Sequence, residues 1–332
     1  MPAENGESMS EVTMARQFRV EAPGNGVIGD VPLPKPSPPD VLVRMRYSGV
    51  SRGTECLIFQ GRVPPSQYDA MRAPFQQGRF PGPVAYGYMA VGDVVEGPDS
   101  LRERSVFCLH PHQDYFVVPG SAVTPIPEAV PAQRAILAAN METAVNAVWD
   151  GRPGPGDRIV VIGGGVVGLL VAWLCRDIPG AAVTLVDTNP ARAITARTLG
   201  LSFATTAEPD ADVVFHASGQ PDGLATALGA AATEATVIEL SWYGDTPVSL
   251  PLGEGFHSRR LTIRSSQVGR LPPDRSPRWD HQRRIHLALE LLHDARLDAL
   301  ITGETPFDAM PALLPELCAD AGNTLCHRIT YA

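Results

Sequence analysis

The sequence has little positive charge, no long apolar run and few cysteines, and each shortage excludes a class of protein. Its 27 Lys and Arg residues are outnumbered by 36 Asp and Glu residues, which gives a net charge of −9 and a pI of about 5.4. Without a basic patch, nucleic acids and anionic membranes are poor partners. The apolar stretch 159–174 contains four glycines and is too short to cross a bilayer.

The cysteines are scattered and odd in number: Cys56, Cys108, Cys175, Cys318 and Cys326. This pattern is typical of reduced thiols in a cytoplasmic protein, so we expect a cytoplasmic location. Residues 1–12 are polar and do not resemble a secretion signal. We expect residues 1–15 to be disordered.

The most informative segment that is present spans residues 158–187, RIVVIGGGVVGLLVAWLCRDIPGAAVTLVD. An apolar strand, Arg158–Ile162, leads into a triple-glycine turn, and a helix continues from there to about Cys175. A second apolar strand, Ala182–Val186, ends on Asp187. The order of strand, glycine turn, helix, strand and acid is typical of a unit that binds a dinucleotide.

Each glycine of this turn has a separate predicted role. Gly163 permits the tight turn, Gly165 lets a pyrophosphate approach the backbone, and Gly168 lets the helix pack closely on the strand. The helix opens at Val166 and Val167, where free N–H groups and the positive end of the helix dipole favour phosphate.

Asp187 indicates which dinucleotide is bound. It lies nineteen positions after Gly168, where a carboxylate can accept hydrogen bonds from ribose hydroxyls and would repel a 2′-phosphate. NAD is therefore favoured over NADP. Arg192 lies near Asp187 in the sequence and could approach the adenine ribose, which leaves NADP as the alternative. FAD normally uses such a unit at the start of a chain, so the mid-chain position argues against a flavoprotein.

The 332 residues suffice for two domains. Residues 16–135 contain short strands between Gly/Pro-rich loops, which indicates a β-barrel-like domain. From 158 to about 270, strands alternate with helices, which predicts a doubly wound parallel sheet. We expect helices over 133–150 and 281–292. The predicted domains are 16–135 together with 285–332 for the β-domain, and 136–284 for the nucleotide-binding domain.

This organisation resembles the medium-chain dehydrogenase/reductase superfamily, which includes the zinc alcohol and polyol dehydrogenases. The matching stretches are 48–55 (SGVSRGTE), 87–97, 141–143 (MET), the glycine turn and 212–219 (DVVFHASG). The GTE triplet and GYMAVG at 87–92 look similar to the bacteriochlorophyllide dehydrogenase-like branch. The resemblance implies an α/β fold with a GroES-like β-barrel catalytic domain and a Rossmann domain. It also implies a homodimer formed through the Rossmann sheet edge.

The zinc ligands of that superfamily are largely absent from the matching positions. The slot of the first cysteine holds Ser51 or Arg52, depending on the anchor, and the His-Glu slot holds Tyr88-Met89. Only Glu142 remains, at a position where polyol dehydrogenases use a glutamate. The four-cysteine structural zinc lobe is also missing. We therefore expect no zinc.

Cys108, His110 and His112 alternate and would face one side of an extended strand. A metal cluster is one interpretation. The other places the histidines at a polar pocket and Cys108 in the core, and it is favoured because no fourth ligand is evident. In the resembled family this stretch borders the substrate pocket, which makes His110 and His112 candidates for acid/base work or substrate contact.

Other residues are candidates for the chemistry that zinc would perform. Tyr88 could donate a hydrogen bond to a substrate carbonyl, or simply fill the space that a metal would occupy. Arg52 could stabilise an oxyanion or form a surface ion pair. Thr54 lies where the family places a proton-relay hydroxyl, or caps a turn. Glu142, inside an apolar helix, indicates a functional or paired carboxylate, and Glu55 could act as a base if desolvated.

On the cofactor side, Ser218 and Gly219 follow the carboxyl end of a predicted parallel strand, and Ser241 follows the next. Trp242 and Tyr243 could contact the nicotinamide half or form an interface. The long segment 62–83 could form a lid over the substrate.

Together these features predict a zinc-independent, NAD(H)-dependent oxidoreductase that acts on a small-molecule substrate and has no nucleic-acid or membrane partner. The alternatives are an enone or quinone reductase that uses NADPH, a non-redox lyase or cyclase that retains the nucleotide-binding domain, and a nucleotide sensor without catalysis.

Overall fold

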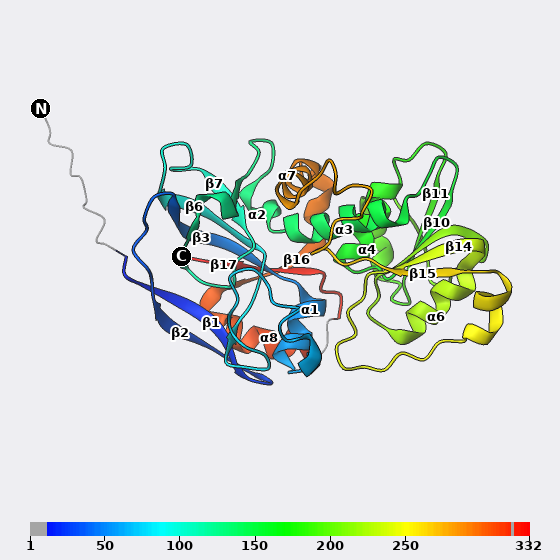
Figure 1. The fold of residues 1–332 in the computed structure, drawn as a ribbon, viewed down its shortest axis with the longest axis horizontal. Coiled ribbons are helices and arrows are strands. Elements are labelled where there is room, and N and C mark those ends of the chain that lie inside the picture. The colour runs from blue at the N-terminus through cyan, green and yellow to red at the C-terminus, as the bar shows by residue number, and fades with distance from the viewer. Residues whose placement is uncertain (1–11, 320–321) are drawn as a thin grey trace, which may run out of the picture.

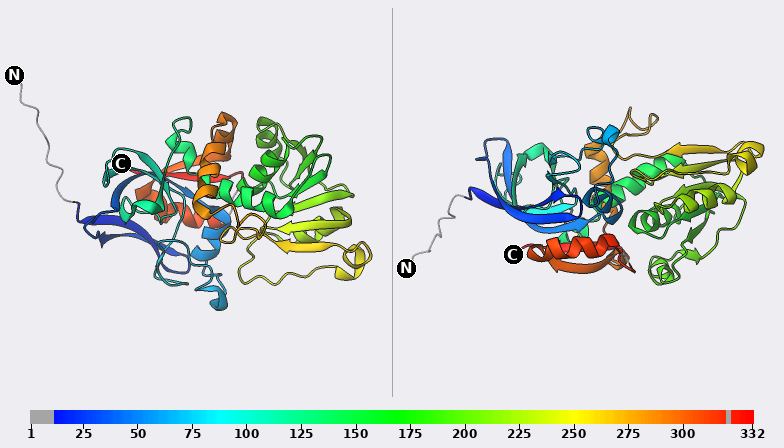
Figure 2. Two further views of the ribbon diagram at one scale, coloured as in Figure 1. Left: turned by 45° about the horizontal axis from the view of Figure 1, so that its top comes forward. Right: turned by 90° about the horizontal axis from the view of Figure 1, so that it is seen from below.

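A computed structural model describes residues 12–319 and 322–332. The molecule is elongated, with a β-barrel at one end and a parallel sheet at the other (Figures 1 and 2). Residues 1–11, part of the segment predicted to be disordered, lie outside the described residues, and the first strand already begins at Met14. Among the described residues, no helix has both the length and the apolarity to traverse a bilayer.

The barrel end is built from two sheets. The first has the strand order β2-β1-β5-β4, and the second has the order β16-β17-β3-β6-β7-β9 with β8 paired to β3. The bounds are β1 Met14–Ala22, β2 Asn25–Pro32, β3 Asp40–Val50, β4 Gln77–Gly78, β5 Val84–Ala85, β6 Ala90–Glu96, β7 Ser105–Cys108, β8 Tyr115–Pro119, β9 Val123–Pro125, β16 Ile301–Pro306 and β17 Cys326–Thr330. Because β17 pairs antiparallel with β3, the C-terminal segment completes the N-terminal barrel.

The other end is a six-stranded parallel sheet in the order β12-β11-β10-β13-β14-β15. Its strands are β10 Arg158–Ile162, β11 Ala182–Val186, β12 Ser202–Ala204, β13 Ala211–His216, β14 Ala231–Glu239 and β15 Thr262–Ser265. Apart from its first residue, β10 is buried throughout, as expected for a strand covered on both faces. The strand order reverses between β10 and β13, and a ligand crevice is expected at such a switch point. The predicted α/β fold is confirmed.

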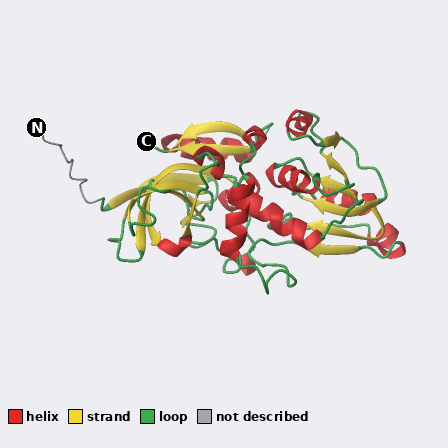
Figure 3. Ribbon diagram, turned by 90° about the horizontal axis from the view of Figure 1, so that it is seen from above, coloured by secondary structure: helices red, strands yellow, loops and turns green. Residues whose placement is uncertain are grey.

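Some helices lie between the strands of the two ends, and others flank the parallel sheet or the barrel (Figure 3). Their bounds are α1 Arg52–Phe59, α2 Ala132–Ala135, α3 Ala138–Gly151, α4 Val166–Cys175, α5 Arg192–Thr198, α6 Pro221–Ala230, α7 His281–Leu291 and α8 Met310–Ala319. The sequence predicted one helix over residues 133–150, but the structure has two, because the helix is interrupted at residues 136–137 between α2 and α3. The side chains of Ile136 and Leu137 are fully buried in the core at this break.

A disulfide between Cys56 in α1 and Cys318 in α8 joins the two terminal segments of the barrel, with a Cα–Cα distance of 5.2 Å. The prediction that all five cysteines are reduced is therefore wrong. The other three, Cys108, Cys175 and Cys326, are free and buried. Spacing could not reveal the pair, because its members are 262 residues apart. The cytoplasmic location stays a prediction.

Candidate functional site

The glycine turn after β10 has the geometry of a phosphate cradle. Gly163 has a φ of +108°, and a Cβ there would lie 2.6 Å from the Ser218 nitrogen. A Cβ on Gly168 would lie 1.9 Å from the Gly163 carbonyl oxygen, so both positions require glycine. By contrast, nothing lies within 4 Å of a Cβ built on Gly165, the N-cap of α4. Open space thus faces the first N–H groups of α4, at Val166 and Val167, and the residues present fit a diphosphate.

Asp187 is held beside this turn. One carboxylate oxygen accepts from the Gly164 N–H at 2.6 Å, and the other accepts from the Asn189 N–H at 2.8 Å. Arg192 is buried and donates instead to the carbonyl oxygens of Asn323 and Thr324, at 2.7 and 3.3 Å. These two hydrogen bonds connect the parallel-sheet part of the chain to the C-terminal segment.

A polar cluster lies where β13 and β14 end. His216 Nε2 is 2.6 Å from the Ser218 hydroxyl, and His216 Nδ1 is 2.8 Å from the Glu239 carboxylate. The Ser241 N–H donates to Glu239 at 2.6 Å, and the Gly219 N–H donates to the Ser241 hydroxyl at 3.1 Å. The structure thus brings the predicted residues Ser218, Gly219 and Ser241 together.

Sequence reasoning missed His216 and Glu239. Burial alone would raise the pKa of Glu239, but hydrogen bonds from His216 and from Ser241 hold it below its usual value. The available signal was that each is the last residue of a parallel strand, β13 for His216 and β14 for Glu239. Such residues meet at one edge of a sheet, and these two are direct partners in the register of β13 and β14.

On the barrel side, Tyr88 forms a second polar group with α1. Its side chain interacts with the side chains of Ser51 and Thr54, and its ring packs edge-on against Tyr86 with centroids 5.8 Å apart. Burial, reinforced by the charge of Glu55, raises the pKa of Tyr88 to about 12. The phenol is therefore protonated at neutral pH and can donate a hydrogen bond.

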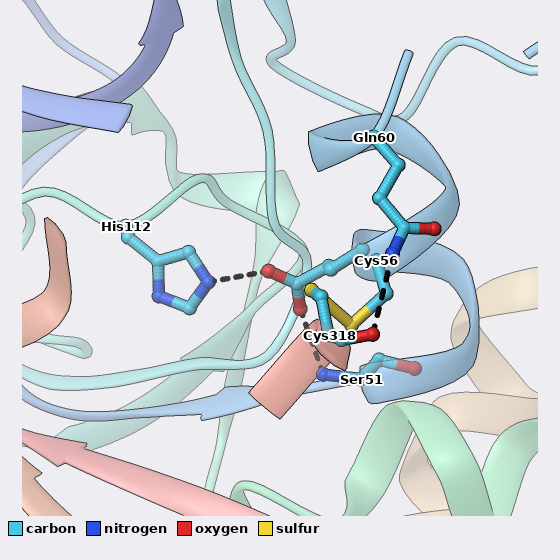
Figure 4. Close-up of a disulfide and its surroundings, with 6 residues drawn as sticks. Ser51, Cys56, Gln60, His112 and Cys318 are labelled. Atoms are coloured by element: carbon cyan, nitrogen blue, oxygen red, sulfur yellow. Dashed lines mark hydrogen bonds and ion pairs between the residues drawn. A yellow bond between two sulfur atoms is a disulfide. The ribbon is translucent and has the colours of Figure 1, made fainter. Parts of the chain in front are cut away.

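His112 pairs with the Glu55 carboxylate of α1 (Figure 4). His112 Nε2 is 2.9 Å from one Glu55 oxygen, and the other oxygen accepts from the Ser51 N–H at 2.7 Å. Both side chains are almost completely buried. Gly87 makes room for the imidazole, because a Cβ there would lie 2.9 Å from His112 Cδ2.

His110 has different surroundings from His112. Its ring stacks on Phe116 with centroids 4.0 Å apart and faces Phe75 at 5.7 Å. Burial lowers the pKa of His110 to about 4, so this imidazole is neutral at pH 7. Cys108 packs in a separate apolar cluster within the barrel, and burial raises its pKa to about 12. In the described ranges, no three His, Cys, Asp or Glu side chains converge as a metal site would require.

Two candidates remain, Glu142 and Arg52. Glu142 forms a buried ion pair with Arg284 of α7, with an N–O distance of 3.0 Å. Burial raises the pKa of Glu142, and Arg284 partly offsets the effect. Arg52 is exposed at the first position of α1.

The loop after β14 reaches the barrel. A Cβ on Gly244 would lie 2.6 Å from the Arg62 carbonyl oxygen and 3.0 Å from the Leu57 side chain. Trp242 and Tyr88 pack against the same apolar cluster of the barrel. The loop that follows β14 therefore reaches α1 and the same apolar cluster that Tyr88 contacts.

This combination of a barrel completed by both chain ends and a Rossmann sheet defines the medium-chain dehydrogenase/reductase architecture. A solved structure described as a short chain alcohol dehydrogenase of Escherichia coli CFT073, complexed with NADH, superposes with a TM-score of 0.76 at 18% identity, over 96% of this chain and 99% of that one. A zinc-binding dehydrogenase of Sinorhizobium meliloti bound to NADP gives 0.75 at 19% identity, over 96% and 99%.

Curated relatives are also dehydrogenases. D-guloside 3-dehydrogenase of Escherichia coli K12 is 24% identical over 294 residues, or 78% of this chain and 83% of that protein. The 2-desacetyl-2-hydroxyethyl bacteriochlorophyllide A dehydrogenase of Rhodobacter capsulatus is 26% identical over 263 residues, 71% and 75%. No protein-family model matches the sequence. These similarities confirm the predicted fold and the prediction of an enzyme of the medium-chain dehydrogenase/reductase type. The zinc-free status and the bacteriochlorophyllide branch stay predictions.

Proposed function

We propose that the protein is a zinc-independent, NAD(H)-dependent oxidoreductase that acts on a small organic substrate. When bound, the nicotinamide would supply or accept a hydride at a carbonyl or alcohol carbon. The observation that carries this proposal is Tyr88, a protonated phenol that packs against the same apolar cluster as Trp242 of the loop after β14. The dehydrogenase relatives support the same reaction class.

NAD is the cofactor that the local charges favour. Asp187 presents a carboxylate beside the glycine turn, where ribose hydroxyls can donate to it and a 2′-phosphate would be repelled. Arg192, the nearest candidate to balance a 2′-phosphate, uses its guanidinium to bind the carbonyls of Asn323 and Thr324. The solved neighbours carry NADH in one case and NADP in the other, so the preference needs a direct measurement.

Tyr88 would take the role that zinc plays in the resembled enzymes. Its hydroxyl can donate a hydrogen bond to a substrate carbonyl oxygen and stabilise the negative charge that develops there. Interactions with the side chains of Ser51 and Thr54 would orient that hydroxyl. The zinc-ligand positions hold Ser51 or Arg52, Tyr88 and Met89, whose hydroxyl, guanidinium and thioether groups do not suit Zn²⁺. The carboxylate that remains, Glu142, is already paired with Arg284.

Two measurements test the proposal. Calorimetry should show that NAD binds more tightly than NADP. Asp187→Ala should weaken NAD binding and narrow the difference in affinity between NAD and NADP. With an alcohol or ketone that supports NADH turnover, Tyr88→Phe should lower kcat by about 10²–10³-fold. Tyr68→Phe, which removes a hydroxyl from a ring that packs on Phe80, is the matched control. Failure of the wild-type protein to bind any nicotinamide dinucleotide would contradict the proposal.

We also propose that two copies associate through the parallel sheet at β15, the terminal strand in its described order. An edge strand offers unpaired backbone groups to a second copy. Sedimentation analysis should give twice the monomer mass of 35.4 kDa. Ile263→Pro in β15 should shift the protein to monomers.

A further inference from the structure

The polar cluster at the ends of β13 and β14 is centred on one carboxylate whose two oxygens both accept hydrogen bonds. One Glu239 oxygen accepts from the Ser241 N–H at 2.6 Å, and the other accepts from the Tyr243 hydroxyl at 2.9 Å. His216 Nδ1 lies 3.0 and 2.8 Å from these two oxygens, and its imidazole is fully buried. With three donors of its own chain around it, the Glu239 carboxylate fixes the positions of those donors.

On one side the cluster reaches the glycine turn. His216 Nε2 lies 2.6 Å from the Ser218 hydroxyl, and that hydroxyl accepts from the Gln220 N–H at 3.2 Å. The backbone of Ser218 packs on Gly163, because a Cβ built on Gly163 would lie 2.6 Å from the Ser218 nitrogen. His216 therefore holds the loop after β13 where that loop contacts the candidate phosphate cradle.

On the other side the cluster fixes the loop after β14. The Ser241 hydroxyl accepts from the Gly219 N–H at 3.1 Å, which joins this loop to the loop after β13. Farther along, Asp245 accepts from Arg62 Nε at 3.0 Å, and Arg62 belongs to the barrel segment that follows α1. The loop after β14 is thus held by Glu239 where it leaves the sheet and by Arg62 where it meets the barrel.

The order of the strands indicates which half of a dinucleotide would lie beside this cluster. The glycine turn follows β10, Asp187 follows the neighbouring strand β11, and β13 and β14 lie on the opposite side of β10. A dinucleotide bound across the switch point has its diphosphate at the turn and its two nucleosides on opposite sides of it. Since Asp187 is on the side of the adenine ribose, the cluster is on the side of the nicotinamide.

We propose that His216 and Glu239 are positioning residues for the nicotinamide half of the cofactor. They hold the loops after β13 and β14 in the arrangement that receives the nicotinamide riboside. The adenosine and the diphosphate, which belong to Asp187 and the glycine turn, do not depend on this pair. The inference rests on the proposed function and adds to it the residues that orient the reactive end of the dinucleotide.

The test compares two ligands by calorimetry: NADH, and ADP, which has the adenosine and diphosphate but no nicotinamide riboside. Glu239→Gln and His216→Phe should each raise the Kd of NADH by about 10-fold or more, because each removes a charge-assisted hydrogen bond from the cluster. The Kd of ADP should stay within about twofold of the wild-type value. Tyr243→Phe removes one donor and leaves the pair intact, so it should have the same selectivity with a smaller effect.

Glu234→Gln is the matched control, because it is the same substitution in the same strand. Glu234 is exposed and pairs with Arg260, and its loss should change the affinity for neither ligand. In folded variants of Glu239 or His216, an equal loss of NADH and ADP binding would show a purely structural role and overturn the inference. Unchanged NADH binding in these variants would overturn it as well.

A second readout reports on the nicotinamide directly. At saturating NADH, the fluorescence anisotropy of the reduced nicotinamide should be lower in Glu239→Gln than in the wild-type protein, because the ring moves more freely while the adenosine half stays bound. Wild-type anisotropy in the saturated variant would overturn the positioning role. Failure of the wild-type protein to bind NADH or NADPH would instead contradict the proposed function, and this result is seen before any variant is made.

Discussion

The Glu142 carboxylate lies 3.0 Å from the Arg284 guanidinium, and both side chains are buried between α3 and α7. Arg284 also donates to the Asn146 side chain and to the Val268 carbonyl. Removing the carboxylate leaves a cation in the core with its main counter-charge lost. We predict that Glu142→Ala lowers the free energy of unfolding by about 3–5 kcal/mol, measured by urea denaturation. Unchanged stability together with lost turnover would instead indicate that Glu142 acts on the substrate.

His110 should make the stability depend on pH. The ordinary pKa is 6.5 and the folded value is about 4, so between these values the unfolded chain binds more protons than the folded one. Stability from this residue is therefore complete above pH 7 and falls as the pH drops toward 4. The loss between pH 7 and pH 5 should be about 2 kcal/mol. Urea denaturation should show a smaller loss for His110→Phe, and an identical loss would refute the assignment.

Gly87 should not tolerate a side chain. Its φ is +139°, and a Cβ would press on the His112 ring at 2.9 Å. We predict that Gly87→Ala costs about 2 kcal/mol of stability, because the His112 ring must move away from Glu55. Gly53→Ala is the control for stability, since no atom lies within 4 Å of its Cβ and alanine favours the helix. Equal melting temperatures for the two variants would contradict this account.

The disulfide predicts how many cysteines carry a free thiol before and after reduction. Alkylation of the denatured, unreduced protein should modify three cysteines, Cys108, Cys175 and Cys326, and prior reduction should raise the number to five. Cys318→Ser should lower the free energy of unfolding by about 2–5 kcal/mol. The double variant with Cys56→Ser should be no less stable than the single one, because both lack the same bond. Five modified cysteines without reduction would show that the bond does not form.

Features that lie close together in the sequence were predictable. The turn, the helix and Asp187 fall within one segment of 30 residues, where spacing and composition fix the geometry. The alternating strands and helices likewise indicated the parallel sheet, because apolar runs and glycine-rich loops mark each element locally.

Long-range pairs were not predictable. Arg284 is 142 positions from Glu142, so no local pattern could show that a conspicuous carboxylate already had a partner. His216 and Glu239 meet only because β13 and β14 adopt one particular register. The Ser48 hydroxyl and Tyr331 are 283 positions apart. Such contacts depend on how the barrel closes, which composition and periodicity leave undetermined.

The bond between Cys56 and Cys318 encloses the entire cofactor-binding sheet within one covalent ring of the chain. A protease that cuts once inside the ring, for example in the loop between β15 and α7, would open it without releasing a fragment. Such a nicked molecule would run as two bands on an electrophoresis gel only after reduction. The N-terminal and C-terminal segments that form the barrel would stay covalently linked by the disulfide. After a single cut or partial unfolding, the parallel-sheet half of the molecule would therefore remain attached to the barrel.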